Sequence, residues 1–298
     1  MSKISFNRLI NKKDKNFKIE PIFNGDKNTP LLEKFLKKQT FLNTEDVLSI
    51  IKINFLKNQP IGYILIENER NIVGFLGTIF SKRKINEMSV EHCYLHSWVV
   101  IERCRLQAFK LILPILNKNI FISTYSPIKS LEGLYKKLEF EENYFYSKII
   151  LSFPFFNLKK IKINKSENAS ISQEYLSSQD KKILNDHNLI SIEKIMIYFD
   201  GNKKNNILIL AKKKIKFKFI PIFEIIYISN PNKFKHYEKE INFMLIKKFK
   251  TILLKINYAN NAKFFPKNLF TRITKKNVYY FNKPKDFNFD VLYSELIG

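Results

Sequence analysis

HCYLHSWVVIERCRLQAFKLILPIL, residues 92–116, is the most informative stretch of this sequence. Its first part alternates between apolar and polar residues like a half-buried strand, and its second part repeats apolar residues at helical spacing. The short polar turn Glu102–Arg105 lies between them. A strand that passes through such a turn into a helix leaves unpaired backbone N–H groups at the helix start, and the helix dipole favours a negative group there. The stretch therefore predicts a phosphate site.

Strand and helix patterns on both sides of this stretch predict a mixed sheet. The strand–helix–strand unit from Val90 to Thr124 is expected to be parallel and right-handed, whereas the other neighbouring strands form hairpins. Residues 81–89 are interpreted as a polar connection, and Pro114 is expected to kink or end the helix in which it lies. The expected strands are Phe17–Phe23, Ile61–Glu67, Asn71–Phe80, Val90–Val100, Asn119–Thr124 and Asn143–Phe153, and the expected helices are Leu31–Lys38, Thr44–Phe55, Arg105–Leu116 and Ser130–Leu138.

The second half of the chain repeats this order more weakly. After a linker and a strand over Lys160–Asn164, two hairpin strands, a helix and a buried strand follow in the same order as before. We therefore expect an α/β protein (α+β mixed sheet) with two related domains, 1–152 and 153–298, each a mixed, mostly antiparallel sheet with helices on its faces. The expected elements are helices Ser178–Asn188 and Asn232–Phe249 and strands Glu193–Phe199, Asn206–Ala211, Lys214–Ser229 and Ile252–Asn257.

The first half resembles the GNAT superfamily of acyl-CoA-dependent N-acyltransferases in its strand order and in two short motifs. In that family the fourth strand leads into a loop of the form Arg/Gln-x-x-Gly-x-Gly/Ala around the pyrophosphate of CoA. Arg105-Leu106-Gln107-Ala108-Phe109-Lys110 is similar to this loop, with Ala108 and Lys110 at the two glycine positions. The whole chain resembles tandem GNAT proteins whose second, degenerate copy has lost the loop.

The second motif lies about thirty residues further on. Leu134-Tyr135-Lys136-Lys137-Leu138-Glu139-Phe140 resembles the family's Tyr-x-x-Leu-Gly-Phe, with Glu139 in place of the glycine. The resemblance puts Tyr135 at the position that protonates the leaving thiolate, and a phenol can donate such a proton across a hydrogen bond in a dry cleft. The alternative is a core aromatic residue on an amphipathic helix.

The resemblance implies a site in which acetyl-CoA or another acyl-CoA donates its acyl group to a small amine. Main-chain groups of Trp98–Ile101, at the end of the fourth strand, are expected to pair with the pantetheine arm as an added strand would, and backbone amides of Leu106–Lys110 are expected to bind the pyrophosphate. An ordinary strand–helix crossover is the alternative. The expected cofactor-binding residues are Trp98, Val99, Val100, Ile101, Arg105, Leu106, Gln107, Ala108, Phe109 and Lys110.

His96 is the candidate base or proton relay for the amine, because it lies near the turn. On a regular strand it shares one face with His92, Tyr94 and Trp98, and the two histidines are roughly 13 Å apart, which excludes a shared metal ion. No metal site is expected. A core or surface histidine is the alternative, and the other candidate bases are Glu67, Glu69 and Glu91.

Other polar residues have simpler interpretations. Cys104 is a weak candidate nucleophile near a helix start, since no His–Asn pattern accompanies it. Asp186 and His187 point about 100° apart on a helix, so they are interpreted as helix-end residues, with a contact between the domains as the alternative. Lys216 and Lys218 fit the wet face of an antiparallel strand better than a nucleic-acid groove.

Composition limits the class of protein. The 298 residues carry a formal net charge of +25, 45% are hydrophobic, and there are two cysteines. Heavy use of Lys, Asn, Ile and Phe suits an AT-rich coding bias, and the alternative is an anionic partner such as a phosphorylated cofactor, nucleic acid or an acidic membrane surface. The polar N-terminus and the lack of a long apolar run predict neither a signal peptide nor a membrane span, and a reducing cytoplasm fits the cysteine usage.

Three functions follow as hypotheses. The first is transfer of an acyl group from acyl-CoA to a primary amine of a sugar or an envelope precursor, with one active domain. The second is an aminoacyl-tRNA-dependent transferase, because more than half of the charge excess lies after residue 150 and the loop departs from the family pattern. The third is a non-catalytic scaffold, because both loop glycines are replaced.

Overall fold

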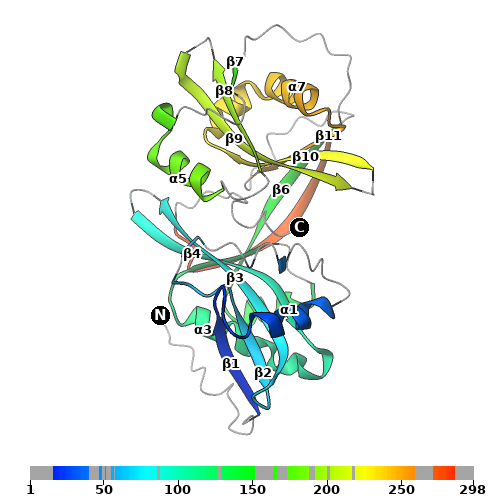
Figure 1. Cartoon of the computed structure of the whole chain (residues 1–298). Helices are drawn as coiled ribbons and strands as arrows, with labels where there is room; N and C mark the ends of the chain where they lie inside the picture. The colour runs from blue at the N-terminus through cyan, green and yellow to red at the C-terminus, as the bar shows by residue number, and fades with distance from the viewer. Residues whose placement is uncertain are drawn as a thin grey trace.

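The computed structural model describes the chain over residues 16–39, 58–85, 88–125, 129–151, 164–166, 173–187, 192–199, 202–216, 219–258 and 271–285, and at a few positions between 47 and 56. The described strands form one twelve-stranded sheet in the order β1-β2-β3-β4-β5-β12-β6-β11-β10-β9-β8-β7 (Figure 1). Antiparallel and parallel pairs both occur. The predicted α/β class with a mixed, mostly antiparallel sheet is confirmed.

The first part of the sheet begins with four successive antiparallel strands. These are β1 (Phe17–Ile22), β2 (Gly62–Glu67), β3 (Asn71–Ile85) and β4 (Met88–Val100), and β5 (Phe121–Tyr125) then lies parallel to β4. The polar connection predicted over residues 81–89 is wrong, because Ser81–Ile85 extend β3 and Met88 begins β4. Arg83 is buried there and donates a hydrogen bond to the Tyr94 hydroxyl at 3.1 Å, so the polar residues have partners within the hairpin.

The helices of this part differ in type from the prediction. α1 (Thr29–Lys37) matches it, whereas Thr44–Phe55 lies mostly outside the described residues. The α-helix predicted over Arg105–Leu116 is wrong: the chain forms a 3₁₀ helix, η2 (Glu102–Leu111), followed by one α-turn, α3 (Leu113–Leu116). Pro114 lies in the first turn of α3, where its missing N–H is tolerated. η3 (Lys129–Leu131) and α4 (Glu132–Lys137) follow β5.

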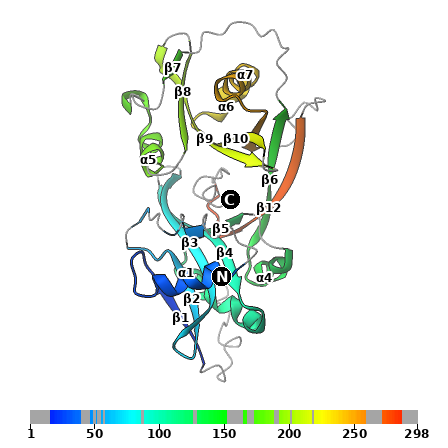
Figure 2. The same ribbon diagram turned by 45° about the vertical axis from the view of Figure 1, so that its right-hand side comes forward.

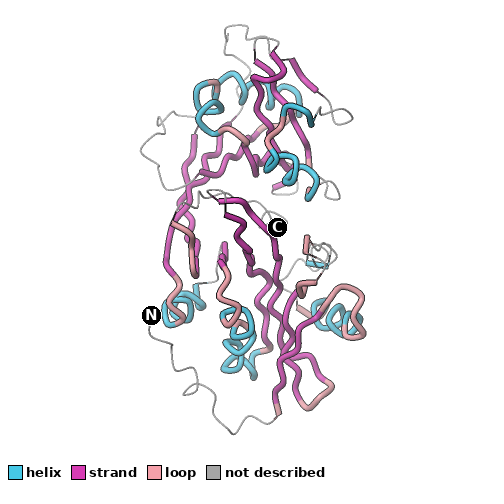
Figure 3. The backbone as a smooth tube through the Cα atoms, turned by 90° about the vertical axis from the view of Figure 1, so that its left-hand side faces the viewer, coloured by secondary structure: helices cyan, strands magenta, loops and turns pink. Residues whose placement is uncertain are grey.

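Helices cover both faces of this part of the sheet (Figure 3). Leu32 and Leu36 of α1 pack with Ile64 and Phe75 in one buried cluster. On the opposite face a second cluster joins residues of η2, α3 and α4 to the strands, including Leu111, Ile115 and Tyr135.

The second part repeats the pairing pattern of β2 to β5. β8 (Glu193–Phe199), β9 (Asn202–Lys216) and β10 (Ile220–Ile228) are successive antiparallel strands, and β11 (Leu253–Tyr258) is parallel to β10. The single strand predicted over Lys214–Ser229 is wrong, since a turn separates β9 from β10. The remaining elements are β7 (Asn164–Ser166), η4 (Gln173–Tyr175), α5 (Ser178–Asp186), α6 (Pro231–His236) and α7 (Glu238–Phe249), so the predicted helix Asn232–Phe249 is divided.

Two long strands join the two parts. β6 (Glu141–Leu151) pairs with β11 of the second part, and its other edge pairs with β12 (Thr271–Phe281). β12 also pairs with β5, so it lies inside the first part of the sheet although it follows the second part in sequence (Figure 2). β12 was not predicted.

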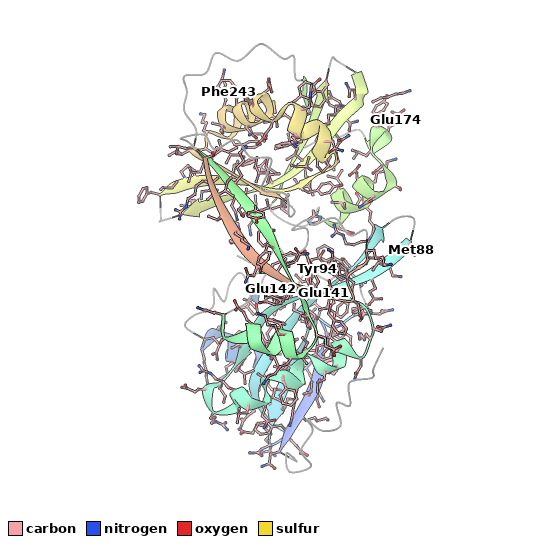
Figure 4. All side chains as sticks on the ribbon, turned by 180° about the vertical axis from the view of Figure 1, so that it is seen from behind. Met88, Tyr94, Glu141, Glu142, Glu174 and Phe243 are labelled. Carbon is pink, nitrogen blue, oxygen red and sulfur yellow. The ribbon has the colours of Figure 1, made fainter. Side chains whose placement is uncertain are left out.

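Side chains from the two parts also pack directly against each other. Ile79 of β3 and Tyr94 of β4 share a buried cluster with Ile183, Leu184 and other residues of the second part. Figure 4 shows Met88 near the end of this hairpin, beside the ribbon of the second part, and Lys182 of α5 donates a hydrogen bond to the carbonyl of Lys82.

Candidate active site

β4 and β5 separate halfway along β4. Their parallel pairing runs from His92, opposite Phe121, to Leu95, opposite Thr124. Beyond Leu95, β4 continues to Val100 in register with β3, whereas Thr124 and Tyr125 lie opposite β12. The edge of β4 that faces away from β3 therefore has no paired strand over residues 96–100 within the described residues. An extended ligand can pair with such an edge.

A β-bulge lies at the start of this unpaired segment. Val99 lies opposite Phe75 and His96 opposite Gly77, so Ser97 and Trp98 together face the single residue Leu76. Ser97 has a positive φ of 46°, in the left-handed region. An extra residue in a strand reverses the faces to which the following side chains point.

The bulge corrects the prediction that His96 and Trp98 share a face. Trp98 packs into the cluster of η2, α3 and α4, whereas the His96 ring meets Phe75, a member of the cluster of α1, with 6.3 Å between ring centroids. His96 and Trp98 therefore lie on opposite faces, at the point where β4 and β5 part.

Tyr135 of α4 lies on the same face as Trp98. The two rings meet edge to face with 5.9 Å between centroids, and Tyr135 is 2% exposed. Burial raises the pKa of Tyr135, and a hydrogen bond with the Thr124 hydroxyl, at the end of β5, partly offsets that rise. The phenol is thus protonated at neutral pH and lies between the diverging strands.

Sequence reasoning missed Tyr279 of β12. Its ring stacks on Tyr135 at 5.2 Å, and its Cα lies opposite Thr124 in the sheet. The signal was present in Thr271–Phe281, which is rich in β-branched and aromatic residues, as strands are. What the local pattern could not indicate is that this strand inserts beside β5.

His96 is a buried neutral imidazole. Burial lowers its pKa to about 3. Nδ1 lies 3.0 Å from the Ser97 hydroxyl, and Nε2 is buried without a hydrogen-bond partner among the described residues. A Cβ on Gly77 would come within 2.2 Å of the His96 ring, so glycine leaves the space that the imidazole fills.

The predicted pyrophosphate loop forms part of η2. Its amides, from Leu106 to Lys110, lie inside the 3₁₀ run rather than at a free helix start, because the helix begins earlier, at Glu102. Ile101 precedes that start and has no side chain able to cap it. Leu106 is 87% exposed, Ala108 and Phe109 are half-buried, and Lys110 is buried.

The side chains of Arg105 and Gln107 occupy different environments in this loop. Arg105 is largely exposed, and its guanidinium lies 3.5 Å from Glu102 in an ion pair. The Gln107 side-chain oxygen is buried and has no hydrogen-bond partner among the described residues. Runs of 3₁₀ helix as long as η2 are uncommon.

The remaining candidates have structural partners. Glu67 binds the Arg103 guanidinium with both carboxylate oxygens, and Glu91 accepts a hydrogen bond from Gln59 at 2.8 Å. Glu69 lies in the turn between β2 and β3, with φ 62°.

The buried histidines and thiol are core residues. His92 lies 2.8 Å from the Ser123 hydroxyl and stacks on Phe121. Burial raises the pKa of the Cys104 thiol, which makes it a poor nucleophile. His187 binds the Ile183 carbonyl at 2.7 Å, within its own helix turn, and its ring lies 6.0 Å from that of Phe55, so the two parts of the chain meet there.

Comparison with known proteins gives fold matches without sequence matches. No protein-family model and no curated protein matches the chain. A GCN5-related N-acetyltransferase from Anabaena variabilis matches with a TM-score of 0.61 at 12% identity, over 89% of this chain and 72% of that one. The chain has the GNAT fold.

Two other solved structures agree. A GCN5-related N-acetyltransferase from Kribbella flavida has a TM-score of 0.55 at 7% identity, over 89% of this chain and 70% of that chain. The N-myristoyltransferase of Saccharomyces cerevisiae with bound myristoyl-CoA has a TM-score of 0.53 at 11% identity, over 92% and 82%. The GNAT-fold matches thus extend over both parts of the chain. Among the described residues, no helix has the length and apolar content needed to cross a bilayer.

Proposed function

We propose that the chain transfers an acyl group from acyl-CoA, such as acetyl-CoA, to the primary amine of a small acceptor. The observation that carries this proposal is the separation of β4 from β5 beyond Leu95, with a bulge at Ser97 and the buried phenol of Tyr135 beside it. The yeast enzyme that shares the fold was solved with myristoyl-CoA bound, which supports an acyl-CoA as cosubstrate.

The donor would bind on the face of η2 and α4. Main-chain groups of β4 from Trp98 to Ile101 would pair with the pantetheine arm. The pyrophosphate would then reach η2, where Arg105 is exposed enough to turn from Glu102 to a phosphate. Tyr135 would give its proton to the departing thiolate, since burial keeps this phenol protonated.

The acceptor would approach from the other face. His96 lies on the side of α1, and its Nε2 has no hydrogen-bond partner among the described residues, so it would accept a hydrogen bond from the attacking amine and could relay its proton. Tyr135 and His96 would thus act from opposite faces of the sheet, Tyr135 on the departing thiolate and His96 on the attacking amine. We propose a small amine as the acceptor, and amino sugars are the class to test.

We further propose two domains, 1–152 and 153–298, of which only the first is active. The recurrence of the β2–β5 pairing pattern in β8–β11 supports a repeated unit. At the position that corresponds to η2, α6 begins with Pro231, which has no N–H, and Asn230 Oδ1 caps the Lys233 amide at 3.0 Å. One N–H of this first turn is therefore absent and another already has a partner, which supports the loss of a phosphate site in the second unit.

Tyr135→Phe in the full-length chain tests the proposal. We expect the variant to bind acetyl-CoA like the wild type, while kcat for acetylation of glucosamine or another primary amine falls about 10²–10⁴-fold. Calorimetry and thiol release measure the two quantities. Tyr198→Phe, which also removes a buried phenol but on β8, is the matched control and should retain full activity.

Two results would contradict the proposal. The absence of acetyl-CoA binding at millimolar concentration would favour a scaffold, and salt-dependent tRNA binding in its place would favour an aminoacyl-tRNA substrate. An unchanged kcat in Tyr135→Phe would show that Tyr135 is not the acid that protonates the thiolate.

A further inference from the structure

The indole N–H of Trp98 is a buried hydrogen-bond donor that lacks an acceptor in the part of the chain that the structure describes. Nε1 is buried and has no hydrogen-bond partner among the described residues. Buried polar groups are almost always hydrogen-bonded, and a buried donor left unpaired costs free energy. An orphaned donor in a native structure therefore calls for an acceptor that comes from elsewhere.

The position of Trp98 indicates which acceptor this is. The Ser97 bulge directs the indole to the face of Tyr135, with 5.9 Å between the two ring centroids. Trp98 also belongs to the segment of β4 that has lost β5 as a neighbour. The indole thus lies beside the phenol that the proposed reaction uses as its acid, where the reacting carbonyl of the donor would lie.

We propose that the Trp98 indole N–H donates a hydrogen bond to the carbonyl oxygen of the donor's thioester. This inference rests on the proposed acyl transfer. As the amine attacks, negative charge builds up on that oxygen, so a fixed donor stabilises the transition state more than the ground state. Trp98 would then supply from its side chain a donor that acts on the oxygen, while Tyr135 acts on the sulfur.

The test compares two ligands that differ in this carbonyl. Acetyl-CoA has the oxygen, and the thioether analogue ethyl-CoA lacks it. We expect the wild type to bind acetyl-CoA about fivefold more tightly than ethyl-CoA, a typical effect of one neutral hydrogen bond. In Trp98→Phe the two affinities should become equal, and kcat should fall about 100-fold. Calorimetry on the full-length protein measures both affinities.

A purely structural role gives a different result. If Trp98 only supports the packing of Tyr135, Trp98→Phe will weaken both ligands equally and leave their ratio unchanged, which overturns the inference. If the wild type itself binds both ligands equally, the inference also fails while the proposed function stands. If the wild type binds neither ligand, the proposed function fails first.

Fluorescence gives an independent readout, because Trp98 is the only tryptophan in the sequence. Acetyl-CoA should change its emission, excited near 295 nm, with the same Kd that calorimetry gives. The matched control combines Trp98→Phe with Phe219→Trp, which moves the indole to an exposed position before β10. Its emission should not respond. An equal response from position 219 would mean a global change and would contradict a local contact at Trp98.

Discussion

His96 illustrates how a buried residue can be tuned without a charged partner. The bulge turns the following residues away from it, Gly77 leaves room for its ring, and burial lowers its pKa to about 3. At neutral pH the imidazole is therefore uncharged and can accept a hydrogen bond, but a pKa this far below 7 makes it a weak base. The same shift makes folding depend on pH.

The stability of the protein should therefore fall in acid. Between pH 6.5 and pH 3 the unfolded chain binds a proton on His96 that the folded chain does not, so stability is full above pH 6.5 and decreases below it. We expect this residue to contribute a loss of about 2–3 kcal/mol between pH 7 and pH 4.5. Urea unfolding at both pH values measures it. In His96→Gln the loss of stability between the two pH values should be smaller than in the wild type by about 2–3 kcal/mol. A loss equal to that of the wild type would contradict the role of His96.

Glu139 occupies a position that suits glycine. It follows α4 with a φ of 60°, in the left-handed region that costs most residues about 1–2 kcal/mol. The GNAT motif that residues 134–140 resemble has glycine at this position, and glycine adopts a left-handed backbone without strain.

Glu139→Gly should therefore stabilise the protein by about 1 kcal/mol. The measurement is the free energy of unfolding in urea. Glu141→Gly is the control, because residue 141 begins β6, where glycine weakens a strand and should destabilise. If both variants destabilise equally, the left-handed backbone at residue 139 is not what limits stability there.

At the scale of elements, β4 extends over Met88–Val100, close to the predicted Val90–Val100, but the sequence did not predict its internal irregularity. Its alternation gives the strand, and its junction with η2 gives the place where a helix begins. The bulge could not be predicted, because Ser97 looks like any polar residue in an alternating run. Its effect is large, since every side chain from Trp98 onward changes face.

The bulge depends on the left-handed backbone of Ser97, which a β-branched side chain disfavours strongly. Ser97→Val should destabilise the protein by about 1–2 kcal/mol and raise the KM for acetyl-CoA. Ser97→Gly should retain both properties, because glycine adopts this conformation freely. Urea unfolding and steady-state kinetics measure these effects. A Ser97→Val variant with wild-type stability and KM would show that the bulge is not needed.

Local patterns predicted other elements with mixed success. β8 has the predicted bounds, because its alternation is clear and a turn signal follows it. η2 is not the α-helix expected from its apolar spacing: Pro114 has no N–H to donate to Lys110 within an α-helix, and it lies in the first turn of α3 instead. The sequence named Trp98 and Tyr135 as candidate site residues, and their rings meet in the structure, whereas Tyr279 comes from a strand that no local pattern could place.

At the scale of the whole molecule, strands that are far apart in the sequence pair with each other and join the two parts. β12 lies between β5 and β6, and β6 also pairs with β11. The first part of the sheet is thus completed by residues that follow the second part, and Tyr279 brings that strand to the candidate site. The two proposed domains are expected to unfold together rather than one after the other.

A chain that ends at residue 258, and so lacks β12, should be unable to complete either part. The facing edges of β5 and β6 would lack their partner, and unpaired strand edges promote aggregation. We expect loss of cooperative unfolding and of acetyl-CoA binding. Circular dichroism and calorimetry measure these. A peptide of residues 271–285 added in trans should restore part of the binding, whereas normal folding without it would contradict the role of β12.

The placement of β12 also affects how the protein is made. β5 and β6 leave the ribosome well before β12 does, because everything from Asn164 to Tyr258 is translated in between. During that interval, at synthesis rates of about 5–20 residues per second, β5 and β6 are present in the nascent chain without the strand that lies between them. A chaperone that shields exposed strands should therefore raise the yield of this protein more than that of one whose sheets are built from consecutive strands.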